Sequence, residues 1–111
     1  MVEYNLVKVG YPAALEPLKQ KINGYRRYSD GIYIGATSAP ELRWAQHVPN
    51  GWTKMAVIYE AFNAEIARAA ESELIRYARS CNFLSEVENG TDGGEGISNR
   101  ARSNFLYILV R

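Results

Sequence analysis

The stretch DGIYIGATSAPELRWAQH, residues 30–47, decides the fold and carries much of the candidate chemistry. Its apolar run at residues 32–34 is ended by a glycine and a turn of small residues, so we expect a strand followed by a turn. Residues 40–47 then read as a short helix, because a proline suits the first helical turn. The chemistry-bearing side chains of this unit are Tyr33 on the strand and Arg43 and His47 on the helix.

Strands are also predicted on both sides of this unit and near the end of the sequence. Residues 2–9 alternate in polarity and are rich in β-branched and aromatic side chains. Residues 52–62 contain an unbroken apolar run, which favours a buried strand. Residues 105–110, FLYILV, are apolar throughout and predict a final strand. With residues 31–36, these segments give three core strands and a C-terminal strand.

Helices are predicted between these strands. The longest covers residues 64–80, which carry one apolar stripe at helical spacing, and Asn63 can cap it. An earlier helix is expected to begin about Pro17 and to stop at Gly24. Ser38 is the candidate cap of the short helix. The pattern predicts a single α+β domain over residues 1–111, with a small, mainly antiparallel central sheet flanked by helices.

The composition is that of an ordinary globular protein. The 111 residues are 47% hydrophobic and 23% charged, and the net charge of +1 does not by itself indicate nucleic-acid binding. A lone Cys81 excludes an internal disulfide framework and a cysteine-type zinc site. Neither a signal peptide nor an apolar run of membrane-spanning length is evident, so we expect a cytoplasmic protein without a membrane partner.

A carboxylate on the long helix is a candidate metal ligand. At 100° per residue, Glu71 lies about 60° and Glu73 about 100° from the centre of the apolar stripe, so Glu71 borders the buried face. One carboxylate, with waters and a substrate phosphate, is enough to bind a hard divalent cation. The spacing leaves open that Glu71 is instead an exposed residue paired with an arginine.

Three motifs, in this order along the chain, resemble those of the GIY-YIG nuclease superfamily. Residues 32–35, Ile-Tyr-Ile-Gly, followed by Arg43 and His47, resemble the second half of the family signature. Residues 71–75, ESELI, are similar to the segment that carries the family's glutamate. Residues 89–96, NGTDGGEG, are similar to an asparagine-to-glycine segment of some members. The resemblance implies a GIY-YIG endonuclease-like fold over most of the chain.

The first half of the family signature departs from the pattern. Gly-Ile-Tyr at residues 31–33 overlaps the second half of the signature at residues 32–35, and one strand cannot supply both tyrosines. We therefore take Tyr4, on the first predicted strand, as the counterpart, and residues 11–29 as an insertion between the first two strands. Tyr28 and Tyr25 are the alternatives to Tyr4.

The resemblance implies a divalent-metal-dependent DNA endonuclease, a hydrolase that cleaves phosphodiester bonds. One Mg²⁺ or Mn²⁺ would be bound by Glu71, and Arg43 would counter the charge on the phosphate. Asn89 would fix the geometry of the site, with Asn82 as the alternative. The implied catalytic residues are Tyr4, Tyr33, Arg43, His47, Glu71 and Asn89. The candidates for contacts with the nucleic-acid backbone are Arg26, Arg27, Lys54 and Arg76.

Two other functions fit the same sequence. A catalytically inactive nucleic-acid-binding module of the same fold is compatible with the altered first motif. A protein–protein interaction domain is compatible with the near-neutral charge and with the apolar segment 105–110. DNA specificity, nicking versus double-strand cleavage and homodimer formation stay open.

Overall fold

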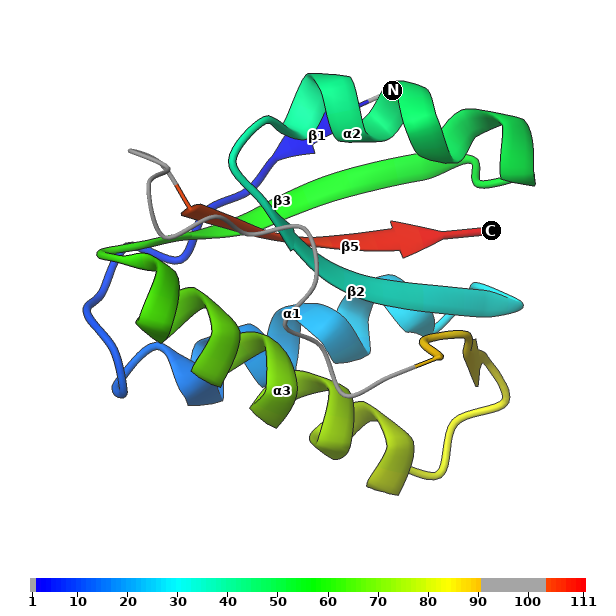
Figure 1. The fold of residues 1–111 in the computed structure, drawn as a ribbon. Coiled ribbons are helices and arrows are strands. Elements are labelled where there is room, and N and C mark those ends of the chain that lie inside the picture. Colours follow the sequence, from blue (N-terminus) through cyan, green and yellow to red (C-terminus); the bar gives the residue numbers. More distant parts are fainter. Residues whose placement is uncertain (1, 91–103) are drawn as a thin grey trace.

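The computed structural model describes residues 2–90 and 104–111, which form three layers (Figure 1). A five-stranded sheet lies in the middle of this part of the chain. Helices α1 (Leu15–Arg26) and α3 (Ala64–Ser80) cover one face, and α2 (Pro40–His47) lies on the other, followed by a 3₁₀ turn at Val48–Asn50. The α+β class predicted from the sequence is confirmed for these residues.

The sheet is mixed, and one central strand runs against its neighbours. Strand β5 is antiparallel to both β2 and β3, whereas β1 is parallel to β3 and β4 is parallel to β2. The order across the sheet is β1-β3-β5-β2-β4. The strands are β1 (Val2–Tyr4), β2 (Gly31–Thr37), β3 (Lys54–Ala61), β4 (Glu86–Val87) and β5 (Asn104–Val110).

The expectation of a mainly antiparallel sheet was therefore wrong, because both edge strands pair in parallel with their neighbours, β1 with β3 and β4 with β2. A helix between two strands allows them to run in the same direction, which a tight hairpin does not. Strands β2 and β3 are joined through α2 and are both antiparallel to β5, so they run the same way. The last strand of the chain lies between them, and β1 is displaced to the edge.

Each face of the sheet has its own apolar core. The face toward α1 and α3 buries aliphatic side chains, of which Leu18, Ile22, Ile34, Leu74 and Ile108 are fully buried. The face toward α2 is more aromatic, with Trp52, Met55, Val57, Tyr107 and Leu109 buried, and Tyr33 and Trp44 packed against them. Because neighbouring residues of a strand point to opposite faces, Tyr33 and Ile34 belong to different cores.

The long helix begins as the sequence predicts. The Oδ1 atom of Asn63 accepts a hydrogen bond from the Ile66 amide at 2.8 Å, so Asn63 is the N-cap of α3. The bounds of α2 also match the prediction, but Ser38 is not its cap. Ala39 occupies that position without a side-chain cap, and the amide of Ala39 donates to Oγ1 of Thr37 at 3.1 Å.

Helix α1 differs from its prediction at both ends. It begins two residues before Pro17, which lies in the first turn, where a missing amide donor costs no helical hydrogen bond. It also continues through Gly24 to Arg26. The buried side chain of Arg26 packs against the C-terminal end of α3, and these tertiary contacts outweigh the weak helix propensity of one glycine.

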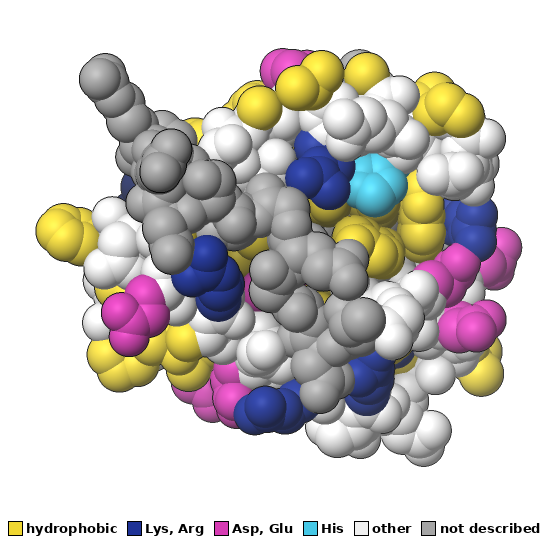
Figure 2. Space-filling view, viewed as in Figure 1, with side chains coloured by type: hydrophobic (Ala, Val, Ile, Leu, Met, Phe, Trp, Pro, Cys, Tyr) yellow, Lys and Arg dark blue, Asp and Glu magenta, His cyan; other side chains and the backbone are white. Residues whose placement is uncertain are grey.

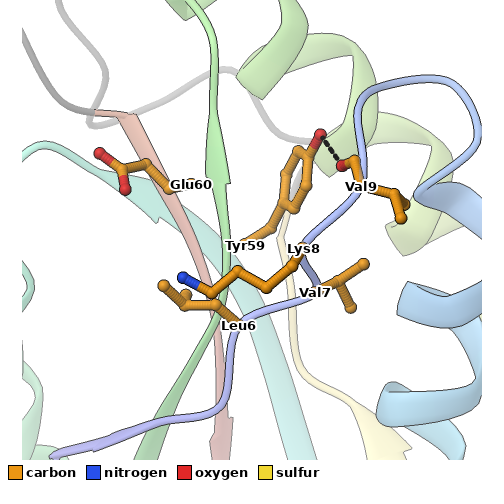
Figure 3. A pocket seen from close by; sticks show the side chains of 6 residues that line it. All are labelled: Leu6, Val7, Lys8, Val9, Tyr59 and Glu60. Carbon is orange, nitrogen blue, oxygen red and sulfur yellow. Dashed lines mark hydrogen bonds between the residues drawn. The ribbon is translucent and has the colours of Figure 1, made fainter.

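The first strand is shorter than the predicted segment 2–9. Beyond Tyr4 the chain still bonds to β3, and β3 itself has a register shift against β5 between Val57 and Tyr59. The Tyr59 hydroxyl donates to the Val9 carbonyl at 2.9 Å (Figure 3). A pocket of about 230 Å³ lies here, lined by none of the predicted site residues but by Leu6, Val7, Lys8, Val9, Tyr59 and Glu60.

Candidate active site

An aromatic cluster on the α2 face of the sheet contains two of the predicted site residues. The rings of Tyr33 and His47 have centroids 5.4 Å apart, and Tyr33 also lies 6.2 Å from Trp52. Tyr107, from β5, lies at a centroid distance of 6.3 Å from Tyr33 and 5.8 Å from His47. In Figure 2, which views the molecule from the side with α2 above the sheet, the histidine lies beside a basic side chain and above hydrophobic side chains.

Gly35 provides the space in which the Tyr107 ring lies. The two residues are directly opposite each other in the β2–β5 ladder. A Cβ atom on Gly35 would lie 2.5 Å from Cζ and 3.0 Å from Cε1 of Tyr107, which is closer than real Cβ atoms approach other groups. The glycine of the Tyr-Ile-Gly motif is therefore needed for the packing of a ring from a neighbouring strand.

A hydrogen bond joins two ionisable side chains of this cluster, His47 and Tyr107. The His47 Nε2 and Tyr107 Oη atoms are 3.0 Å apart. Burial, with a contribution from Arg43, lowers the pKa of His47 below its ordinary value of 6.5. Burial raises the pKa of Tyr107 well above its ordinary value, and Tyr33 adds to this. Both pKa shifts favour a neutral imidazole and a neutral phenol, with Nε2 of His47 accepting a hydrogen bond from the Tyr107 hydroxyl.

Arg43 lies one turn before His47 on α2, so both side chains project from the same side of the helix. The Arg43 side chain is half-buried, and it acts electrostatically on two members of the cluster. It lowers the pKa of His47 and opposes the upward shift in the pKa of Tyr107. The structure therefore brings Arg43, His47 and Tyr33 together, as the sequence predicts.

Glu71 lies on α3, which covers the other face of the sheet, and it acts electrostatically on Tyr107 of the cluster. Its side chain is 2% exposed, and its charge adds to the raised pKa of Tyr107. Among residues 2–90 and 104–111, no group of three or more histidine, cysteine, aspartate or glutamate side chains could hold a metal ion. A buried single carboxylate still fits the class of Mg²⁺ site that is completed by waters and substrate phosphate.

Asn89 fixes the outer edge of β2 between Tyr33 and Gly35. Its Nδ2 donates to the Ile34 carbonyl at 2.6 Å, and its Oδ1 accepts from the Ile34 amide at 3.0 Å. The carboxamide thus pairs with the strand as a backbone residue would. Asn89 is therefore bonded to the strand that carries Tyr33, whereas its alternative, Asn82, is exposed after the end of α3. Residues 91–96 of the predicted glycine segment lie outside the described residues.

The structure does not bring Tyr4 to the cluster. Tyr4 is opposite Val57, Val57 is opposite Tyr107, and Tyr107 is opposite Gly35, so β3 and β5 separate Tyr4 from β2. At about 4.8 Å per strand, Tyr4 lies roughly 14 Å from β2. It is 53% exposed, and burial and then Glu41 raise its pKa.

The two alternatives to Tyr4 also lie away from the cluster. Tyr28 is 92% exposed to solvent. The Tyr25 hydroxyl donates to Glu3 and accepts from Asn5 at 3.2 Å, on the side of the sheet edge toward α1.

Tyr107 is a residue of the site that was not predicted from the sequence. The final strand is aliphatic at most positions, and a phenol buried in such a strand needs a hydrogen-bond partner. The sequence therefore indicates that Tyr107 has a polar neighbour, but it does not identify that neighbour as His47. Only the strand order shows that β5, and not β1, lies beside β2.

Two of the predicted nucleic-acid contacts have other roles. Arg26 is 2% exposed, and its guanidinium donates to the Ala78 carbonyl and to both Oγ and the carbonyl of Ser85, each at 2.8 Å. These three hydrogen bonds engage its guanidinium and hold the end of α3 and the following segment together. Lys54 pairs with Glu3 at 3.0 Å and lies over the Tyr25 ring.

The other two candidates are exposed at the surface. Arg27 follows α1, and Arg76 lies on α3, 3.9 Å from Glu73.

Comparisons with known proteins add no assignment to this geometry. No protein-family model matches the chain, and searches of curated proteins and of solved structures found no match. No helix within the described residues has the length and hydropathy of a membrane span. The side chains of the site are therefore the basis for a functional proposal.

Proposed function

We propose that this protein is a divalent-metal-dependent DNA endonuclease of the GIY-YIG type. One observation carries the proposal: Tyr33, His47 and Tyr107 are in mutual contact above Gly35, with Arg43 and Glu71 close enough to shift the pKa of Tyr107. A cation, a histidine and two phenols on the α2 face, with a buried carboxylate on α3, are groups that can catalyse phosphodiester hydrolysis.

The tyrosine role first expected at Tyr4 is assigned to Tyr107. The raised pKa of Tyr107 disfavours a resting phenolate, so this phenol acts by passing a proton on. The attacking water transfers one proton to the Tyr107 oxygen while Tyr107 transfers its own proton to Nε2 of neutral His47. The water oxygen forms a bond to phosphorus, and the bond from phosphorus to the leaving ester oxygen breaks.

The remaining residues bind and orient the substrate. Arg43 pairs with oxygens of the scissile phosphate through its planar fork and stabilises the charge that develops on them. Tyr33 packs beside His47 and orients the water or the phosphate. Glu71 would hold one Mg²⁺ or Mn²⁺, which supplies charge neutralisation at the phosphate and at the leaving oxygen. Asn89 keeps β2, and with it Tyr33, in position.

Plasmid cleavage tests the proposal. Supercoiled DNA is incubated with Mg²⁺ or Mn²⁺ and with wild type, Glu71→Ala, Arg43→Ala or Glu65→Ala, which removes an exposed carboxylate of the same helix as Glu71. We expect wild type and Glu65→Ala to cleave at similar rates and the two site variants to lose at least about 100-fold. Equal activity in all four proteins would show that the site assignment is wrong.

Two other outcomes would favour the alternative functions. Salt-sensitive DNA binding without any cleavage would favour a binding module, because phosphate contacts release counterions. Absence of salt-sensitive binding would favour an interaction domain.

A further inference from the structure

Two arginines of α3 lie on one side of the helix. Arg68 and Arg79 are eleven residues apart, which is about three turns, so their directions differ by only about 20°. Their Cα atoms are separated by about 16 Å along the helix axis. Arg68 is half-buried and Arg79 is exposed. The two therefore form a basic edge along α3, which we call the Arg68–Arg79 edge.

The Arg68–Arg79 edge borders the candidate active site. The Nη2 atom of Arg79 donates to the Asn89 carbonyl at 2.9 Å, and the Asn89 side chain is bonded to Ile34 of β2. Glu71 follows Arg68 by one turn and lies about 60° round the helix from it, toward the buried face. The Arg79 end of this edge therefore lies beside the outer edge of β2, the strand that carries Tyr33.

The two arginines also lie on opposite sides of Glu71 along the helix axis. Arg68 is about 4.5 Å before Glu71, and Arg79 is about 12 Å after it, at 1.5 Å per residue. A phosphate held at Glu71 would thus have a guanidinium on each side of it along α3. In the view of Figure 2, basic side chains lie at several separate places on the surface rather than in one cluster.

The charges on the rest of α3 are arranged differently. Arg76 lies about 80° round the helix from Arg68, farther from the buried face, and its guanidinium is 3.9 Å from Glu73. The sequence suggested Arg76 as a contact with the nucleic-acid backbone, but its position places it away from the site, so we assign it no such contact. It therefore serves as the matched control, a basic residue of the same helix.

We infer that Arg68 and Arg79 bind the DNA backbone on the two sides of the phosphate that reacts near Glu71. They take the role that the sequence first suggested for Arg26, which is buried, and for Lys54, which lies over the Tyr25 ring of α1. Contacts of this kind position a strand along α3 without reading its sequence. The inference rests on the proposed nuclease function, because it assumes that the reacting phosphate lies at Glu71.

The salt dependence of DNA binding tests the inference separately from cleavage. A fluorescently labelled duplex of about 20 base pairs is titrated without divalent metal between about 50 and about 300 mM NaCl. Wild type, Arg68→Gln, Arg79→Gln and Arg76→Gln are compared. Each phosphate contact contributes about 0.9 to the slope of log affinity against log salt concentration. We expect Arg68→Gln and Arg79→Gln each to reduce that slope by about one and Arg76→Gln to leave it unchanged.

Charge-retaining variants separate phosphate binding from a structural role. Arg79 also bonds the Asn89 carbonyl, so Arg79→Gln could act by loosening that segment. Arg68→Lys and Arg79→Lys keep the charge, and we expect them to keep the slope of wild type.

Three results would overturn the inference. If wild type binds, a salt slope that falls by about one in Arg68→Lys or Arg79→Lys would overturn this inference alone. A wild-type slope in Arg68→Gln and Arg79→Gln would do the same. Absence of salt-dependent binding by wild type would overturn the proposed function together with it.

Discussion

The contact between Gly35 and Tyr107 makes the most specific prediction about stability. Gly35→Ala places a methyl group 2.5 Å from Cζ and 3.0 Å from Cε1 of the Tyr107 ring. Tyr107 is 1% exposed, so the ring cannot move aside into solvent without leaving its core. Overpacking of a core costs about 1–3 kcal/mol. Displacement of the ring also breaks its hydrogen bond to His47, which adds about 0.5–1.5 kcal/mol.

We therefore expect Gly35→Ala to lower the free energy of unfolding by about 2–4 kcal/mol. Equilibrium unfolding in urea at neutral pH measures this change from the shift in midpoint. The same substitution is then made in a Tyr107→Leu background, in which the outer ring atoms and the hydroxyl are gone. There we expect the alanine to cost less than about 1 kcal/mol, because nothing remains at the clashing positions.

The double-mutant comparison can refute this reasoning directly. A cost below about 0.5 kcal/mol in the wild-type background would mean that the ring does not lie over Gly35. An equal cost in both backgrounds would mean that the alanine acts through the strand itself and not through Tyr107. Either result would also leave the glycine of the Tyr-Ile-Gly motif without its packing role.

Three further predictions concern His47, Asn89 and Arg26. The cleavage rate should rise with pH to a plateau, with a midpoint below 6.5, because His47 accepts a proton only when neutral and its pKa is lowered; a midpoint above about 7 in a pH–rate profile would contradict this. Asn89→Leu should lower the free energy of unfolding in urea by about 1–3 kcal/mol, because the Ile34 amide and carbonyl lose their side-chain hydrogen bonds. Asn82→Leu should change that free energy little. Arg26→Met should cost about 2–4 kcal/mol by the same assay and Arg27→Met less than about 0.5 kcal/mol, since only Arg26 is buried; similar costs would contradict it.

Elements with local signals were predictable from the sequence. The bounds of α2 and α3 match the structure because a proline, an asparagine cap and an apolar stripe act within a few residues of one another. The same periodicity predicts Glu71 at the border of the buried face, and in the structure its side chain is 2% exposed. The prediction that Arg43 and His47 lie on the same side of α2 required only their helical spacing of four residues.

Features that depend on distant pairing were not predictable in the same way. The alternation of residues 2–9 indicates a strand but does not say which strand it pairs with. Tyr4 was taken as the tyrosine of the first strand, but the pattern could not show that β1 lies at the far edge and that β5 lies beside β2. The burial of Arg26 likewise depends on carbonyl partners that lie 52 and 59 residues away in the chain.

Cleavage by single tyrosine variants tests most directly the claim that the last strand completes the site. Tyr107→Phe removes one hydroxyl and its bond to His47, whereas Tyr4→Phe removes a hydroxyl from an exposed edge strand. In a plasmid assay with Mg²⁺ or Mn²⁺, we expect Tyr107→Phe to reduce the rate by at least about 100-fold. We expect Tyr4→Phe to cleave at nearly the wild-type rate. Full activity in Tyr107→Phe, with loss of activity in Tyr4→Phe, would contradict the site built around Gly35.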